Sequence, residues 1–258
     1  MRRVMAVAEY IFKQSFRNRI LNILIIFAVF AIGFSLVVSE LAQESEIKMI
    51  TDFGLFAISI FAFLTLVLSI TVQMFEETEL KTLLVVMVKP IKRHEYIAGK
   101  FIGIAGMILM NVILMLATLM LILKYKGADP WNIQLIVSAG SSFLAASILT
   151  AAAMLLSVIS TSVPGCVIFL FFVYVLGHLT VHLKSMAQGM ENGAARIAID
   201  FIYYAFPNLE LFNLKDKIYS PEGLFSGYYL SLMLGYAAAY SAVLLLAASM
   251  IFEKKEFY

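Results

Sequence analysis

The chain has 258 residues, of which 62% are hydrophobic and 14% are charged, and its formal net charge is +2. Soluble domains average about 45–50% apolar and about 25% charged residues, so this composition excludes an ordinary soluble protein and indicates an integral membrane protein. The single cysteine, Cys166, excludes a disulfide framework and a cysteine-based metal site. We therefore expect an all-α membrane protein whose residues 1–258 form one transmembrane domain.

The first segment, residues 1–19, is too highly charged to enter the membrane. Five apolar residues recur at helical spacing, and most of the five basic residues lie elsewhere on the same helix. The apolar residues are Val4, Ala8, Ile11, Phe12 and Phe16. This pattern predicts a basic amphipathic helix that lies on an anionic membrane surface. Two interpretations stay open: the segment only orients the first span, or it takes part in coupling.

Six later segments are predicted to span the membrane, because each has about 20 or more residues and a helix rises about 1.5 Å per residue across a core of about 30 Å. The fourth and fifth come from one uncharged stretch, which Pro164 divides because proline ends or restarts a helix. Residues 40–52 are predicted to be a short polar loop. The predicted spans are 20–39, 53–75, 101–123, 131–160, 163–183 and 228–252.

The orientation follows from the positive-inside rule. Six spans place both ends of the chain on the same side of the membrane. With that side in the cytosol, segments 1–19, 76–100 and 253–258 carry twelve of the Lys and Arg residues, and the opposite side carries seven. We therefore expect both termini in the cytosol, with residues 184–222 as an outer segment.

The charged segment 76–100 lies between the second and third predicted spans. Lipid cannot accept it, because burying each ion would cost several kcal/mol. Residues 79–87 are predicted to form a short helix that Pro90 ends, and a second short helix leads into the third span. Such a compact unit at the cytosolic surface can transmit force between a soluble partner and the two spans that it joins.

The order of residues in 79–103 resembles that of a known family. The order is Glu79-x-x-Thr82-Leu83, then Lys89-Pro90-Ile91-x-Arg93-x-x-Tyr96, then Gly99-Lys100-Phe101-x-Gly103. It resembles the segment between spans two and three of type-2 ABC exporter permeases, the membrane subunits of ATP-binding-cassette transporters, including the group linked to multicopper-enzyme maturation. Lys81 stands where that family usually has glycine.

The resemblance implies an interfacial N-terminal helix, a cytosolic coupling helix between spans two and three, and short outer helices between spans five and six. It implies a homodimer that binds two copies of a separate ABC ATPase in a prokaryotic cytoplasmic (inner) membrane. ATP and Mg would bind to that ATPase and no cofactor to this chain, which has no Gly-x-x-x-x-Gly-Lys-Ser/Thr phosphate loop. The other expected partners are membrane lipids and a periplasmic accessory protein, and no nucleic acid is expected.

The resemblance also assigns residues to roles, none of them catalytic or metal-binding. The residues expected to dock the ATPase are Glu79, Thr82, Leu83, Pro90, Arg93 and Tyr96. The candidate transport pathway consists of Thr65, Ser69, Gln73, Phe172 and Tyr174. Phe206, Pro207 and Asn208 are the candidate outer gate, although an ordinary periplasmic interfacial helix would show the same aromatic pattern.

Two alternatives belong to other functional classes. A membrane-embedded hydrolase would use Glu76 and Glu77 with His178 and His182, which are four residues apart on one helix face. The predicted topology opposes it, because the glutamates and the histidines lie on opposite sides of the membrane. The second alternative is a non-transporting scaffold with a permease fold. The sequence predicts neither the substrate nor the direction of transport.

Overall fold

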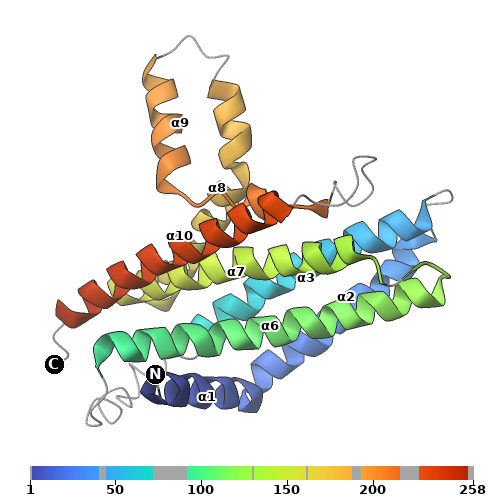
Figure 1. The fold of residues 1–258 in the computed structure, drawn as a ribbon, viewed down its shortest axis with the longest axis horizontal. Helices are drawn as coiled ribbons and strands as arrows, with labels where there is room; N and C mark the ends of the chain where they lie inside the picture. The colour runs from blue at the N-terminus through green and yellow to red at the C-terminus, as the bar shows by residue number, and fades with distance from the viewer. Residues whose placement is uncertain are drawn as a thin grey trace.

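A computed structural model describes residues 2–40, 45–71, 92–129, 131–160, 162–187, 193–215 and 227–254 of the chain (Figure 1). These residues form eight α-helices, one short 3-10 helix and no strand. The elements are α1 (Arg2–Arg17), α2 (Arg19–Ser39), α3 (Glu46–Ile70), α6 (Arg93–Tyr125), α7 (Ile133–Ile159), α8 (Val163–Ala187), α9 (Gly193–Ala205), η2 (Glu210–Phe212) and α10 (Gly227–Lys254).

Six of these helices are long and apolar enough to cross a membrane: α2, α3, α6, α7, α8 and α10. The number agrees with the six spans predicted from the sequence, and the arrangement is that of a multi-pass membrane protein. The predicted break before Pro164 is present, since α7 ends at Ile159 and α8 begins at Val163. Pro164 is tolerated there because the first turn of a helix has no intrahelical acceptor for its backbone N–H groups.

Two helices extend beyond the predicted spans. The helix α3 begins at Glu46, so part of the expected polar loop 40–52 is helical. The helix α6 begins at Arg93, so the short helix expected before the third span is continuous with that span. Polarity marks where a span leaves the lipid and does not mark where its backbone stops being helical. With 33 residues, α6 is about 50 Å long and exceeds the thickness of a bilayer core of about 30 Å.

The helices α3, α6 and α7 form the centre of the bundle and contact one another. Around them, α2 packs on α3 and α6, α10 packs on α6 and α7, and α8 packs on α7. The outer helices leave large apolar side chains exposed, among them Phe27, Phe30, Phe169, Phe172 and Leu246. In water so much exposed apolar surface would be a liability, whereas lipid is as apolar as these side chains.

The helix α1 begins and α10 ends at the same end of the bundle, which also carries the first turn of α6 (Figure 1). We call this the proximal end, and the opposite end, with the last turn of α6, the distal end. At the distal end Lys126 donates a hydrogen bond of 2.9 Å to Glu46. This bond raises the pKa of Lys126 and joins the end of α6 to the start of α3. The helices α8 and α9 pack against each other as a hairpin that projects from the bundle (Figure 1).

Candidate functional site

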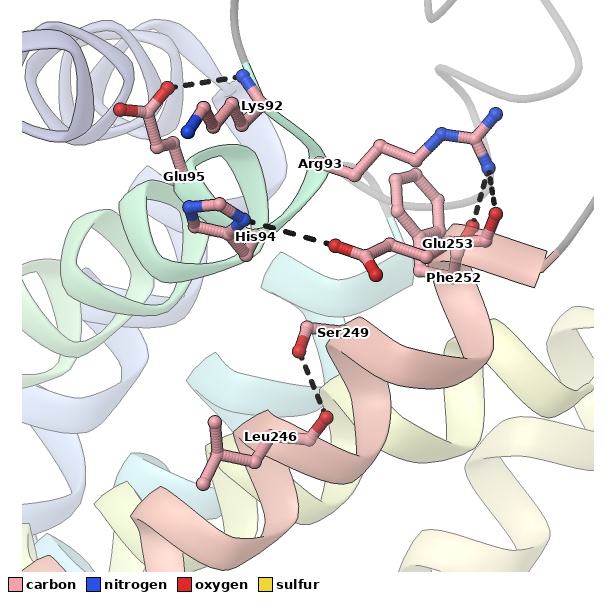
Figure 2. Close-up of polar contacts among 8 residues, drawn as sticks. All are labelled: Lys92, Arg93, His94, Glu95, Leu246, Ser249, Phe252 and Glu253. Atoms are coloured by element: carbon pink, nitrogen blue, oxygen red, sulfur yellow. Dashed lines mark hydrogen bonds and ion pairs between the residues drawn. The ribbon is translucent and has the colours of Figure 1, made fainter.

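The proximal end is organised around Arg93, the first residue of α6. Its guanidinium Nη1 donates hydrogen bonds to the carbonyl oxygens of Phe252, at 2.7 Å, and of Glu253, at 3.0 Å. These carbonyls belong to the last turn of α10, whose final carbonyl groups have no helical donor. Figure 2 shows the side chain reaching across to that turn. A positive charge is also favourable there, because the C-terminal end of a helix carries partial negative charge.

Aromatic contacts reinforce the junction between α6 and α10. The rings of Tyr96 and Phe252 stack with centroids 6.0 Å apart, and Arg93 lies 5.8 Å from the centroid of the Phe252 ring. His94 Nδ1 lies 3.8 Å from a carboxylate oxygen of Glu253. Lys100 is fully buried, with its ammonium 4.8 Å from the centroid of the Tyr96 ring. The start of α6 is thus joined to the end of α10 through several side chains.

The helix α1 packs against the same part of α6 through two glycines. A Cβ atom at Gly99 would lie 2.6 Å from the Cβ of Val7, and one at Gly103 would lie 2.7 Å from the Cβ of Ile11. Backbone oxygens of α1 would lie 2.9 Å from both positions. Glycines four residues apart let two helices approach this closely. Arg3 adds an ion pair of 3.9 Å with a carboxylate oxygen of Glu95.

The six residues expected to dock an ATPase divide into two groups. Glu79, Thr82, Leu83 and Pro90 lie outside the described residues, as do Glu76 and Glu77 of the hydrolase alternative. Arg93 and Tyr96 lie in the first turn of α6, directly after the segment 72–91, and contact α10. The contacts described for Arg93 and Tyr96 are therefore made within the chain.

The described residues of the candidate pathway belong to α3 and α8 and differ in how deeply they are buried. Thr65 and Ser69 are fully buried in α3, and Thr65 Oγ1 accepts a hydrogen bond of 2.6 Å from Asn111 Nδ2 of α6. Tyr174 of α8 stacks on Phe63 with ring centroids 4.3 Å apart, whereas the side chain of Phe172 is about half exposed. Gln73 lies outside the described residues.

The candidate outer gate belongs to an irregular segment, residues 206–214, that the surrounding helices hold in place. The backbone N–H of Asn208 donates to Tyr236 Oη at 2.9 Å, and the next N–H donates to the carbonyl oxygen of Gly177 at 2.9 Å. Gly177 lies ten residues before the end of α8, which corresponds to about 15 Å. Pro207 is buried, and Phe206 and Asn208 are half-buried. The segment thus lies well below the end of α8.

Side chains from two helices satisfy further backbone groups of this segment. Ser141 Oγ of α7 donates to the carbonyl oxygen of Phe212 at 2.7 Å, and Tyr229 Oη of α10 donates to that of Leu211 at 2.8 Å. Backbone groups that are removed from water need hydrogen-bond partners, and these side chains supply them. These contacts give the segment a defined conformation.

The histidines of the hydrolase alternative are not part of a metal-binding cluster in the described ranges. His178 Nδ1 lies 2.9 Å from the carbonyl oxygen of Tyr174. Where the structure describes the chain, no three or more His, Cys, Asp or Glu side chains gather as a group that could hold a metal ion.

Several residues that organise these regions were not predicted from the sequence. Asn111 could have been noticed as the only amide side chain in the uncharged run 101–123, since such a group in a span needs a partner. Gly99 and Gly103 were noted only as part of a motif, although their spacing is typical of close helix contact. No local signal distinguishes Ser141, Tyr229 or Tyr236 from the many other serines and tyrosines of the spans.

Comparison with known proteins does not assign the chain to a family. No protein-family model matches the sequence, and no curated protein matches it.

Proposed function

We propose that this chain is the transmembrane permease subunit of an ATP-driven ABC exporter, working as a homodimer with two copies of a separate ATPase. The proposal rests on the residue order 79–103 and on six helices able to cross a membrane. In this mechanism the ATPase binds segment 76–100 on the cytosolic side. ATP-induced closure of the ATPases then moves that segment and tilts α3 and α6.

One observation supports the mechanism above the others: the first turns of α6 contact both α1 and the end of α10. A displacement applied to segment 72–91 reaches α6 at its first residue, Arg93. Because α6 is joined there to α1 and α10, these helices would move with it instead of letting α6 bend alone. Force applied at one place would therefore act on three helices.

The proposed homodimer would use the exposed face of α8 as its interface. Ile168, Phe169 and Phe172 are all more than half exposed on this helix, which packs on only a small part of the bundle. In the proposed dimer, α8 lines the route near the dimer axis. The proposal includes a prokaryotic inner-membrane location with both termini in the cytosol.

Co-purification tests the proposal. The tagged chain should bring down an ABC ATPase, recognised by mass spectrometry and by ATPase activity in the purified complex. Glu79→Lys should remove that ATPase, because it reverses a charge in the docking segment. Glu40→Lys makes the same charge reversal at the end of α2 and should leave the complex intact. Recovery of the ATPase with Glu79→Lys, or no ATPase with the unaltered chain, would contradict the proposal.

A further inference from the structure

A groove lies between α6, α7 and α10, three helices that pack against one another (Figure 1). Its volume is about 420 Å³. Ligand pockets in proteins typically measure about 300–1,000 Å³, have mainly apolar walls, and include spaces between the helices of a bundle. The groove therefore has the size and the place of a ligand pocket.

The side of the groove that α10 forms is made of small residues. They are Ala237, Ala238, Ser241 and Ala242, and large side chains such as Phe101 of α6 and Phe143 of α7 stand around them. Ala238 and Ala242 are exposed, so the groove is open to the surroundings of the bundle. The exposed face of α2 differs, since it presents large side chains such as Phe27 and Phe30.

Ser241 has hydrogen-bonding capacity that the described part of the chain does not use. Its side chain is only 6% exposed, and its Oγ is buried with no partner among the described residues. Two other serines of α10 differ: Ser231 Oγ donates to the Tyr228 carbonyl oxygen at 2.8 Å, and Ser249 Oγ to that of Leu246 at 2.9 Å. A buried hydroxyl without an acceptor costs free energy. The groove thus favours an occupant that brings an acceptor.

The rest of the lining sets the polarity of that occupant. Ser147, the other serine of the lining, already donates to the Leu144 carbonyl oxygen at 2.7 Å. The lining has no charged side chain. An ion would lose its hydration here without a partner of opposite charge. The part of the occupant that lies in the groove is therefore uncharged and mainly apolar.

The position of Ser241 along α10 excludes an ordinary lipid chain as the acceptor. Ser241 lies halfway between Gly227 and Lys254, about 20 Å from either end of the helix, which places it near the centre of a bilayer core of about 30 Å. A saturated acyl chain is hydrocarbon at that depth, because its ester group lies at the interface. A serine side chain has three staggered orientations, so the hydroxyl can turn toward an oxygen in the groove.

We propose that this groove binds an apolar chain that carries one carbonyl or hydroxyl oxygen at the depth of the membrane centre, such as a keto- or hydroxy-acyl chain. Phe101, Phe143 and Leu245 contact the chain, and Ser241 donates a hydrogen bond to its oxygen. The site does not depend on the transport proposal, since it uses residues of one chain and none of α8.

Binding is tested by competition on the purified full-length chain in detergent. The two probes are a phosphatidylcholine with a ketone at the middle of one acyl chain and the saturated phosphatidylcholine of the same chain length. Native mass spectrometry measures how much of each lipid the chain retains and whether the chain is a dimer. The variants are Ser241→Ala, which removes the hydroxyl, and Ala238→Leu, which fills the groove. Ser249→Ala is the matched control, because it removes a hydroxyl of the same helix that already has an acceptor.

We expect the unaltered chain to retain the ketone lipid about tenfold better than the saturated lipid, the effect of one hydrogen bond in an apolar site. Ser241→Ala should abolish this preference while still retaining the saturated lipid. Ala238→Leu should reduce retention of both lipids, and Ser249→Ala should leave the preference unchanged.

Three outcomes would overturn the proposal. Equal retention of both lipids by the unaltered chain would mean that the groove takes ordinary lipid chains. A preference for the ketone that persists in Ser241→Ala would mean that Ser241 is not the donor. Retention of neither lipid, together with dimers that Ala238→Leu disrupts, would assign the groove to a second copy of the chain.

Discussion

At the residue scale, Arg93 shows how one side chain can join two ends of the chain. It begins α6, and its guanidinium bonds to carbonyl oxygens that lie 159 and 160 residues further along. The last carbonyl groups of a helix generally lack a donor within that helix, and an arginine in this position supplies hydrogen bonds to such groups. Arg93 was predicted to dock an ATPase, and its contact with α10 gives it a role in the isolated chain as well.

Arg93→Gln is expected to destabilise the isolated chain by about 1.5–3 kcal/mol, because hydrogen bonds from a charged donor are lost. The measurement is thermal unfolding of the detergent-solubilised chain with no ATPase present. Lys92→Gln is the matched control, since that neighbouring side chain is exposed and its loss should change the unfolding temperature little. Equal unfolding temperatures for the two variants would show that the contact with α10 contributes nothing to stability.

At the element scale, the close approach of α1 and α6 depends on glycine. Gly99 and Gly103 face backbone atoms of α1, which cannot move away as a flexible side chain can. Gly106, one turn further on, is different: a Cβ there would make an ordinary contact of 3.5 Å with the Phe12 ring. The same helix therefore contains both a test position and its control.

Gly103→Ala is expected to be less stable than Gly106→Ala by about 1–3 kcal/mol, the usual cost of overpacking. Both variants gain the same helix propensity, so the difference between them reports the packing of α1 alone. Thermal unfolding measures the difference, and limited proteolysis should cut α1 faster in Gly103→Ala. Similar stabilities and cleavage rates would contradict the close contact.

The conformation of the irregular segment 206–214 also depends on neighbouring elements, because side chains of the helices form hydrogen bonds with its backbone groups. Tyr236→Phe leaves the Asn208 N–H without its acceptor, so local opening should become about 1.4 kcal/mol easier and hydrogen exchange of that amide about tenfold faster. Hydrogen–deuterium exchange measures this directly. Tyr228→Phe removes a hydroxyl from a largely exposed side chain of the same helix and should have no such effect. Unchanged exchange in Tyr236→Phe would contradict the assigned bond.

At the scale of the whole molecule, the two ends of the helix bundle are formed by different elements. The proximal end holds α1, the start of α6 and the end of α10, and the distal end holds the pair Lys126–Glu46. The excess of basic residues in segments 1–19, 76–100 and 253–258 predicts that the proximal end faces the cytosol.

Cysteine labelling tests that orientation. In a Cys166→Ala background, Tyr125→Cys at the distal end should react with a membrane-impermeant maleimide in intact cells. Lys13→Cys on α1 should react only after the membrane is permeabilised. Both native side chains are well exposed, so access from the aqueous side decides the result. The reverse labelling pattern would show that the topology is inverted. If both cysteines reacted from the same side of the membrane, the chain could not cross the membrane an odd number of times between Lys13 and Tyr125.

The sequence alone predicted the helical class, the number of long apolar helices and the break before Pro164. These features depend on local properties: the length of uncharged runs and the conformational limits of proline. The helical start of α3 at Glu46 was not predicted, because the polar residues before the second span indicate where lipid ends and not where the helix begins.

Only the tertiary structure showed which distant residues meet. The contacts of Arg93 with α10, of Gly103 with α1 and of Tyr236 with Asn208 join residues far apart in the chain, and no local spacing encodes such pairs. The same holds for a cavity of about 140 Å³ whose lining comes from α3, α7, α8 and residues 209–215. The physical reason is that composition decides whether a helix enters lipid, whereas its partners are decided by shape and by the hydrogen bonds that remain to be satisfied.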